Sequence, residues 1–316
     1  MDGRAELDPE VAAAFDGTPM AAIDFGTYTF ADMPSVRDMM DNAPRPPLPP
    51  TSTVSEERSA DGVPVWVFTP AGAVAPAPVV LFVHGGGFFF GRASTSAATL
   101  NAWADAFGCV IVSVEYRLAP EHPYPAPLED CYTALKWVAG HAGELGVDAG
   151  NIVVVGQSAG GGLAAGLALL ARDRGEVQIA YQLLIYPMLD DRGITPSSRR
   201  DAVVWSPGAN VLGWRAYLGD LYGRDDVPAY AAPSRATDLR GLPPAFIGVG
   251  TADGFCDEDI TYALGLLGAG VPTELHVYPG APHGFEVMLQ DAAVARRARR
   301  DIADALGRAL SRRPPS

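Results

Sequence analysis

Lysine is almost absent from this 316-residue chain, in which Lys136 is the single one. Schiff-base chemistry and P-loop phosphate binding both require a lysine at the reacting group, so this scarcity argues against both. Basic residues as a whole are few: 23 Lys and Arg stand against 37 Asp and Glu, for a net charge of -14. A nucleic-acid partner would require a basic surface that neutralises phosphates, so no nucleic acid is expected.

Cysteines are also few, and their number is odd. Cys109, Cys131 and Cys256 lie in or beside apolar segments, which favours reduced thiols in a cytoplasmic protein over a disulfide framework. The sequence does not begin with a signal-peptide pattern, and its longest apolar stretches, such as 76–83, are shorter than the ~18 residues of a membrane span. We therefore expect a cytoplasmic protein without a membrane span.

Metal-ligand patterns are missing as well. His122, His141 and His276 have no ligand-like spacing to one another or to the cysteines. We therefore expect no metal and no organic cofactor.

Apolar, β-branched runs recur along most of the chain and alternate with helix-like stretches. Such alternation predicts an α/β fold with a mostly parallel central sheet flanked by helices. The pair Asp61-Gly62 is a hairpin signal, so the sheet is expected to begin with antiparallel strands at 53–57 and 64–69. The later strands are expected at 79–83, 110–114, 152–155, 179–185, 245–249 and 274–278.

Two stretches interrupt this alternation. Residues 1–50 have the pattern of amphipathic helices followed by a polyproline-like linker at 45–50, and residues 189–235 carry aromatic side chains among loop-like polar ones. An insertion at the carboxyl edge of a parallel sheet lies where ligand crevices form. We predict that these two stretches form a helical cap over a catalytic α/β domain made of 51–188 and 236–316. An ordinary role in completing the core remains an open alternative for the helices.

The most informative stretch is the run VVVGQSAGGG at 153–162, which reads as a strand, a sharp turn and a helix with Ser158 at the turn. Gly156 and Gly160 fit the G-x-S-x-G pattern, in which small residues allow a strained turn that holds a serine hydroxyl out of the sheet. We interpret Ser158 as a nucleophile. The alternative is a glycine-rich turn with an incidental serine, since short motifs also match by chance.

A serine nucleophile requires donors for the oxyanion. The run HGGGF at 84–88 follows a predicted strand and exposes main-chain N–H groups without side chains. We expect the oxyanion hole to consist of the N–H groups of Gly85, Gly86 and Ala159, the last of which follows the nucleophile. The position of His84 suits a hydrogen bond that braces the loop.

The nucleophile also requires a base and an acid that orients the base. His283 lies in the loop after the last predicted strand, whereas His276 lies within that strand, so His283 is the candidate base. The chain order Ser, Asp or Glu, His of this hydrolase type places the acid between them. Asp253 ends a predicted strand and is our candidate, with Asp257 as the second choice.

Together these motifs resemble the α/β-hydrolase superfamily, and within it the hormone-sensitive-lipase-like carboxylesterases. The resemblance covers about 79–285. It is most specific at HGGGF (84–88), at YRLAPEHPYPA (116–126) followed by Glu129-Asp130, and at GQSAGG (156–161). It implies the α/β-hydrolase fold, a cap joined by a late insertion, and a homodimer.

The chain departs from the family pattern at two places. Gln157 stands where the family commonly has Asp or Thr, and the sequence offers no account of what the amide changes. Residues 254–256 (GFC) stand between Asp253 and Asp257-Glu258, where the family has Asp-Pro-Leu-x-Asp-Glu. From the same resemblance, Arg117, Glu121 and Asp130 are expected to form a buried charge network.

We hypothesise a serine hydrolase that cleaves carboxylic esters, its small-molecule substrates, through an acyl-enzyme. An apolar pocket lined by Phe88, Phe89, Trp205 and Trp214 would favour short-to-medium acyl chains. The alternative is a non-catalytic small-molecule receptor on the same fold, which in relatives lacks the base. The arginine-rich run at 295–300 is expected to be the solvated face of a terminal helix.

Overall fold

The computed structural model describes residues 6–43 and 48–311, so residues 45–47, half of the predicted linker at 45–50, lie outside the described residues. Within them, eight strands form one sheet in the order β1-β2-β4-β3-β5-β6-β7-β8. β1 and β2 pair antiparallel, as do β2 and β4, and every other pair is parallel. The strands are β1 (Val54–Ala60), β2 (Val63–Thr69), β3 (Ala77–Val83), β4 (Val110–Val114), β5 (Val147–Gln157), β6 (Tyr181–Ile185), β7 (Ala245–Gly250) and β8 (Thr273–Tyr278).

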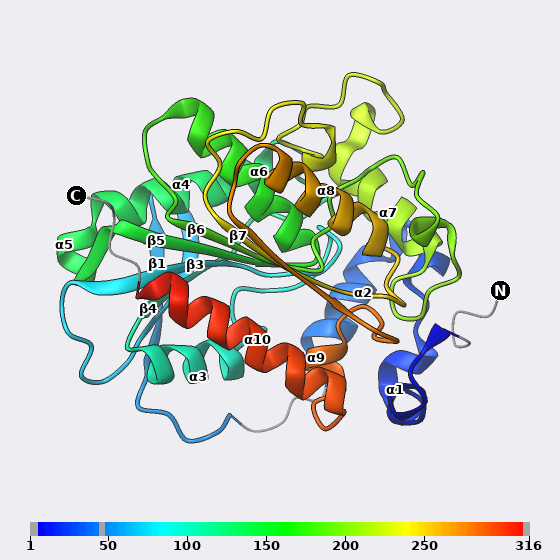
Figure 1. Ribbon diagram of the computed structural model, residues 1–316, viewed down its shortest axis with the longest axis horizontal. Coiled ribbons are helices and arrows are strands. Elements are labelled where there is room, and N and C mark those ends of the chain that lie inside the picture. The colour runs from blue at the N-terminus through cyan, green and yellow to red at the C-terminus, as the bar shows by residue number, and fades with distance from the viewer. Residues whose placement is uncertain (1–5, 44–47, 312–316) are drawn as a thin grey trace.

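Helices cover both faces of the sheet (Figure 1). α3 (Ala97–Phe107) and α10 (Ala293–Leu310) pack on one face, and α4 (Ala126–Gly140), α6 (Ala159–Arg174) and α8 (Cys256–Gly268) pack on the other. The inner strands β3, β4, β6 and β7 are buried almost throughout, which explains their continuous apolar runs. The predicted α/β fold class is thereby confirmed. The short helices α5 (Ala142–Leu145) and α9 (Phe285–Met288) lie in connections.

β5 is longer than the predicted strand at 152–155. It begins at Val147, which pairs with Ala77 of β3, and the register shifts between Ala77 and Val79. The extension carries exposed residues, Ala149 and Gly150 among them. An apolar run in the sequence does not predict this extension of β5, because a bulged strand end need not be buried.

The N-terminal segment and the late insertion contact each other. The first contains α1 (Pro9–Phe15), capped by the Asp8 carboxylate at 2.8 Å from the Glu10 N–H, and α2 (Met33–Asp41). The second contains α7 (Pro207–Leu218). A methyl group on Gly26 would lie 2.8 to 2.9 Å from the start of α7, and Ser206 donates to Asp24 at 2.8 Å. The remaining short 3-10 helices are Pro19–Ala22, Phe25–Thr27, Phe30–Asp32, Ser197–Arg199, Gly219–Leu221 and Pro233–Arg235.

Arg37 joins α2 to the loops around the sheet. Its guanidinium donates to the main-chain oxygens of Phe89 and Ala119 at 2.8 Å and pairs with Glu121. Arg117 pairs with Asp130 instead, at 2.7 Å. The expected buried network of Arg117, Glu121 and Asp130 is therefore wrong in two respects. Glu121 pairs with an arginine 84 residues away in the chain. Only Asp130 is buried, whereas Arg117 and Glu121 are exposed.

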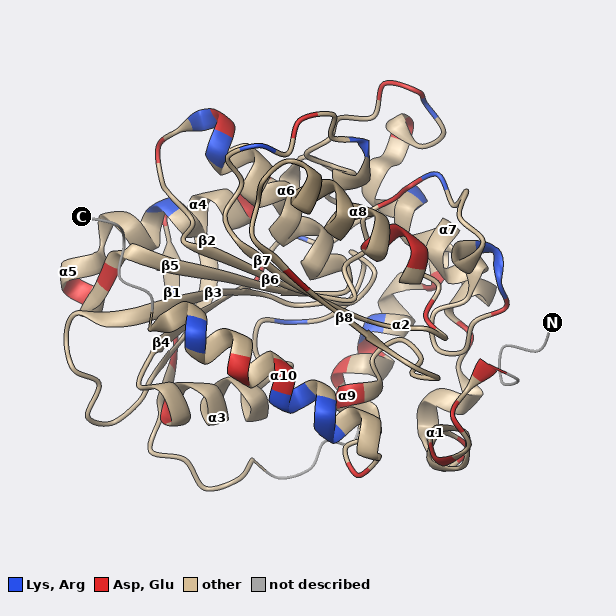
Figure 2. Cartoon of the chain, in the orientation of Figure 1, with Lys and Arg blue, Asp and Glu red and all other residues tan. Residues whose placement is uncertain are grey.

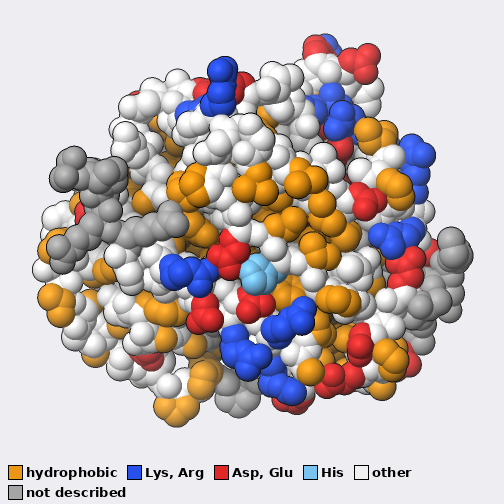
Figure 3. Space-filling model, in the orientation of Figure 1, with side chains coloured by type: hydrophobic (Ala, Val, Ile, Leu, Met, Phe, Trp, Pro, Cys, Tyr) orange, Lys and Arg blue, Asp and Glu red, His pale blue; other side chains and the backbone are white. Residues whose placement is uncertain are grey.

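Charged side chains are spread along the outer helices. Figure 2 shows basic and acidic residues interspersed on α10, where Ala295 and Ala298 are buried while Arg296, Arg297 and Arg300 are exposed. The arginine-rich run is thus a solvated helix face, as predicted. Figure 3 shows hydrophobic side chains gathered on one face of the molecule. Two exposed leucines of α8 are Leu264 and Leu267.

Among the described residues, the structure contains no helix long and apolar enough to cross a membrane. All three cysteines are buried free thiols.

Candidate active site

Ser158 lies between β5, which ends at Gln157, and α6, which begins at Ala159. Its backbone has φ 57° and ψ -124°, a region that residues other than glycine rarely adopt. The turn is crowded: a Cβ on Gly156 would lie 2.2 Å from the Gly160 oxygen, and one on Gly160 would lie 2.2 Å from the Val83 oxygen. Glycine at both positions thus lets the strained turn pack directly against the end of β3.

The turn brings Ser158 to His283 and Asp253. His283 Nε2 lies 2.8 Å from Ser158 Oγ, and His283 Nδ1 lies 2.8 Å from Asp253 Oδ2. All three side chains are buried, with 7%, 7% and 1% of Ser158, His283 and Asp253 exposed. Because a carboxylate accepts, Nδ1 carries the proton in this arrangement and Nε2 is left to accept from the serine hydroxyl. Parallel strands produce the convergence, since the loops after β5, β7 and β8 leave the same edge of the sheet.

The other two candidates for base and acid lie elsewhere. His276 is on β8, where Nε2 lies 2.8 Å from Glu274 and Nδ1 lies 3.3 Å from Asp301. Asp257 accepts from the Ser197 N–H at 2.7 Å and so ties α8 to the late insertion. Neither group is hydrogen-bonded to Ser158 or His283 among the described residues.

Asp253 also organises the residues that depart from the family pattern. Its second oxygen accepts from the Phe255 N–H at 3.0 Å, and the Phe255 ring meets the His283 ring edge-on at 5.1 Å. The run at 254–256 therefore leaves the aspartate facing the histidine.

The glycine-rich loop lies against the serine turn. A Cβ on Gly85 would be 3.2 Å from Ser158 Cβ, and Gly86 has φ +122°, where a Cβ would lie only 2.0 Å from the Phe90 oxygen. The N–H groups of Phe89 and Phe90 both donate to the Gly86 oxygen at 3.0 Å. Within the described part of the chain, no backbone acceptor is found for the N–H groups of Gly85, Gly86 or Ala159. These groups remain available to an external oxygen.

His84 braces this loop. Its Nδ1 donates to the Gly85 oxygen at 2.8 Å, its ring stacks on Tyr116 at 4.2 Å, and the Tyr116 hydroxyl donates to the His84 oxygen at 2.8 Å. Burial lowers the pKa of His84 to about 4, so the imidazole is neutral at physiological pH. A buried neutral ring with this hydrogen bond suits support of the loop rather than proton transfer.

The four aromatic residues predicted to line a pocket fall into two groups. Trp205 lies beside the triad, with ring centroids 6.2 Å from His283 and 6.1 Å from Phe89. Phe88 and Trp214 pack against each other at 5.3 Å, each 1% exposed. Trp205 therefore contacts the triad histidine and Phe89 contacts Trp205, whereas Phe88 and Trp214 pack against each other.

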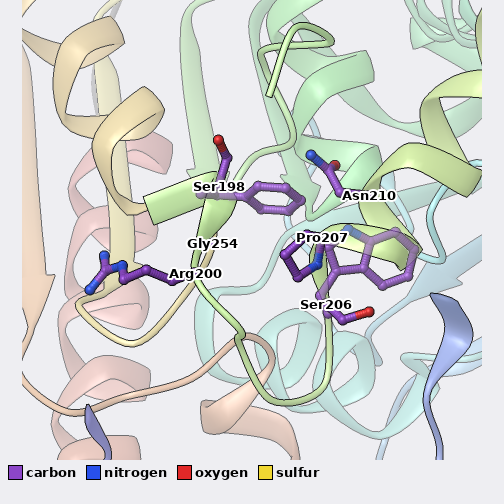
Figure 4. A pocket seen from close by; sticks show the side chains of 8 residues that line it. Ser198, Arg200, Ser206, Pro207, Asn210 and Gly254 are labelled. Carbon is purple, nitrogen blue, oxygen red and sulfur yellow. The ribbon is translucent and has the colours of Figure 1, made fainter. Parts of the chain in front are cut away.

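A small open hollow, without enclosed room for a water molecule, lies behind Trp205. Figure 4 shows Pro207 and Asn210 on one side of it and Arg200 on the other. Trp205 Nε1 and Asn210 Oδ1 are buried without a hydrogen-bond partner within the described residues. The hollow is lined by Ser198, Arg200, Trp205, Ser206, Pro207, Asn210, Gly254 and Phe255.

Two residues near the triad escaped the sequence reasoning, Tyr186 and Glu286. The Tyr186 ring lies 4.6 Å from the His283 ring, and the Glu286 carboxylate accepts from Tyr186 and Gln157. Position alone could have indicated both, because Tyr186 directly follows a predicted strand and Glu286 stands three residues after His283.

Buried carboxyls continue beyond Asp253 on the first turn of α8. Glu258 accepts from the N–H groups of Leu189 and Asp190 at 2.8 and 3.1 Å. Asp259 is 0% exposed, and neither of its oxygens has a hydrogen-bond partner in the part of the chain that is described. Burial, and then the charges of Glu258 and Asp253, raise the pKa of Asp259 well above its usual range.

Asp259→Asn is therefore expected to stabilise the protein at alkaline pH. The unfolded carboxyl ionises above pH ~4, whereas the folded one holds its proton up to a raised pKa, so the wild type loses stability as the pH rises between them. An uncharged isostere avoids that loss. We expect a Tm gain of roughly 2–4 °C at pH 8 and a smaller one at pH 5, measured by calorimetry.

Asp304→Asn on the exposed face of α10 is the control and should leave the Tm within about 1 °C at both pH values. An equal Tm change for Asp259→Asn at pH 5 and pH 8 would contradict the titration argument.

The chain is similar in sequence to known proteins. The family model described as alpha/beta hydrolase fold matches residues 80–287. The chain belongs to this family. Esterase LipI of Mycobacterium tuberculosis (strain ATCC 25618 / H37Rv) is 37% identical to this α/β hydrolase over 90% of the chain and 89% of that protein. Carboxylesterase NlhH of the same organism is 38% identical over 97% of each chain.

Solved structures of esterases also resemble this α/β hydrolase. A bacterial heroin esterase superposes with a TM-score of 0.89 at 42% identity, covering 98% of this α/β hydrolase and 99% of that chain. Esterase LipW from Mycobacterium marinum superposes with a TM-score of 0.85 at 37% identity, covering 98% of each. The resemblance to the carboxylesterases is thereby confirmed.

Proposed function

We propose that this α/β hydrolase is a carboxylesterase in which Ser158, His283 and Asp253 form the catalytic triad. The observation that carries the proposal is the hydrogen-bond chain from Ser158 Oγ through His283 to Asp253, with both links at 2.8 Å. Similarity to esterases over almost the whole chain supports carboxylic esters as the substrate class.

Each group has a definite task in this mechanism. His283 Nε2 takes the proton of Ser158 as its oxygen attacks the ester carbonyl, and the N–H groups of Gly85, Gly86 and Ala159 stabilise the oxyanion. His283 then gives that proton to the leaving alcohol, and an acyl-enzyme remains. The same imidazole then takes a proton from water, whose oxygen attacks the acyl carbonyl, and gives that proton to Ser158 Oγ as the acid leaves. Asp253 holds the imidazole in the tautomer that this sequence needs and stabilises its charged form.

The acyl group of the substrate would pack against an apolar wall formed by Trp205 and Phe89. Trp205 lies over the glycine loop, where a Cβ on Gly87 would approach its ring to 2.2 Å, and Phe89 stacks beside it. These bulky rings leave little room next to Ser158, which favours short-to-medium acyl chains over long ones.

A series of p-nitrophenyl esters of increasing acyl length tests both the activity and this size limit. We expect kcat/KM to peak between about two and eight carbons and to fall beyond about ten, because added methylenes gain little where the pocket ends. A maximum above about ten carbons would contradict the proposed wall. Trp205→Ala, which shortens that wall, should move the maximum to longer chains.

No observation favours the alternative of a non-catalytic receptor, since the base that such a receptor would lack is present and hydrogen-bonded to the serine. We also propose that 1–50 and 189–235 act as a cap, supported by the Asp24 to Ser206 contact and by the position of Trp205 beside His283. A cytoplasmic location and a homodimer stay predictions.

A further inference from the structure

The side chain of Gln157, the residue before the nucleophile, takes part in a buried hydrogen-bond cluster. Its Nε2 donates to the Tyr186 hydroxyl and to Glu286 Oε1, both at 2.8 Å. The Tyr186 hydroxyl donates to the same Glu286 oxygen. One carboxylate oxygen thus accepts from two partners that are 129 and 100 residues away in the chain.

The cluster joins the segments that carry the triad. Gln157 ends β5 and precedes Ser158, while Glu286 lies on the first turn of α9, three residues after His283. Tyr186 follows β6, and the Ser158 N–H donates to the neighbouring Ile185 oxygen at 2.9 Å. Tyr186 has φ +37°, a strained value, and its ring lies 4.6 Å from the His283 ring at 60°. Strain of this kind persists where the surroundings enforce it, and it is common at functional sites.

An amide at position 157 is chemically matched to Glu286. It supplies two N–H donors without adding charge, whereas a carboxylate there would face Glu286 with a second acceptor and a like charge. Glu286 is 4% exposed, and its Oε2 has no hydrogen-bond partner within the described residues. Burial raises the pKa of Glu286, and hydrogen bonds from Tyr186 and Gln157 act in the opposite direction. Donors at Oε1 therefore matter to whether this group keeps its charge.

We propose that Gln157, Tyr186 and Glu286 are positioning residues that hold the imidazole of His283 at bonding distance from Ser158, with the Glu286 charge favouring the imidazolium that forms during catalysis. The proposal rests on the proposed function. It also accounts for Gln157, the residue for which the sequence offered no explanation.

Several other groups face the cluster, and each stays in place in the variants below. Asp253 bonds the far nitrogen of His283. Tyr278 of β8 contacts the Phe285 ring at 5.5 Å and donates to Asp301. Arg299 of α10 donates to the main-chain oxygens of Glu286 and Gln290 at 2.9 and 2.6 Å. A change confined to Glu286 therefore reports on its own charge and hydrogen bonds.

The test exchanges the amide and the carboxyl. In Glu286→Gln two amides face each other, and in Gln157→Glu two carboxyls do, so we expect kcat to fall about 10- to 100-fold in each, with KM within about threefold. The double variant with Gln157→Glu and Glu286→Gln restores one amide and one carboxyl. We expect it to recover kcat to within about fivefold of the wild type, as coupled residues do in a double-mutant cycle.

The pH profile tests whether Glu286 acts on His283 through its charge or only by supporting the position of the ring. Loss of the negative charge in Glu286→Gln makes protonation of the nearby imidazole less favourable, so the acidic limb of kcat/KM should move to lower pH by about half a unit. Glu258→Gln is the matched control, because the Glu258 carboxylate is also buried but accepts from the N–H groups of Leu189 and Asp190, outside the cluster. That variant should leave the midpoint unchanged.

Tyr186→Phe removes one hydroxyl and keeps the ring, so it tests the cluster should Glu286→Gln fail to fold. It should lower kcat about tenfold, with thermal unfolding confirming a folded protein. Single variants with wild-type kcat and midpoint would overturn the proposal. A loss of kcat in the single variants would also overturn it if the double variant recovers no kcat and the midpoint of the pH profile does not move. Absence of hydrolysis in the wild type would instead reject the proposed function.

Discussion

Ser158→Ala is expected to lower kcat for ester hydrolysis by about 10⁴- to 10⁶-fold, the size of loss seen when a serine hydrolase loses its nucleophile. The change removes a single oxygen atom, whose partner is His283 Nε2 at 2.8 Å. Alanine carries no atom that could attack a carbonyl. The main-chain hydrogen bonds of the turn, from the Ser158 N–H to the Ile185 oxygen and from the Met188 N–H to the Ser158 oxygen, do not involve the hydroxyl. The fold should therefore survive, as near-wild-type thermal unfolding would show.

Labelling with a fluorophosphonate probe tests the same role of Ser158 without any substrate. The wild type should take up one equivalent at Ser158, as mass spectrometry of the labelled peptide would show, and Ser158→Ala should take up none. Ser198→Ala is the control: Ser198 lines the hollow behind Trp205, and its hydroxyl donates to the Thr195 oxygen, so labelling and hydrolysis should persist. Hydrolysis at wild-type rate by Ser158→Ala would remove Ser158 from the mechanism.

Asp253→Asn should have the second largest effect, a fall in kcat of about 10³- to 10⁴-fold at neutral pH. Asp253 Oδ2 accepts from His283 Nδ1. An amide in its place provides no charge for the imidazolium and can present an N–H to the ring, which places the imidazole proton on Nε2, where it blocks acceptance from Ser158. Steady-state kinetics with a short-chain p-nitrophenyl ester measures the loss.

Asp257→Asn is the matched comparison, since the sequence left Asp257 as the second candidate for the acid. Its carboxylate accepts from the Ser197 N–H and lies on the side of α8 that holds the late insertion. We expect kcat within about threefold of the wild type. A larger loss for Asp257→Asn than for Asp253→Asn would reverse the assignment of the acid.

The agreement between sequence and structure is closest where a residue is constrained by its immediate neighbours. The turn at Ser158 could be predicted because a Cβ at Gly156 or Gly160 would collide with main-chain oxygens. Continuous apolar runs predicted the buried parallel strands because both faces of those strands are covered.

Contacts between distant segments could not be predicted in the same way. Arg37 pairs with Glu121, which is 84 residues away in the chain, and Gln157 donates a hydrogen bond to Glu286, which is 129 residues away. Such pairs depend on the direction and rotamer of each side chain after the sheet has formed. The local sequence around either partner does not contain that information.

The sequence by itself determined the α/β architecture, the serine turn and the glycine loop, because backbone sterics and the alternation of apolar runs act over a few residues. Tertiary structure decided between Asp253, the first choice from the sequence, and Asp257. It alone decided which aromatic ring lies beside the triad and what the amide of Gln157 binds. Those choices depend on how the loops after β5, β6, β7 and β8 approach one another at the sheet edge, and that approach is set by packing of the whole chain.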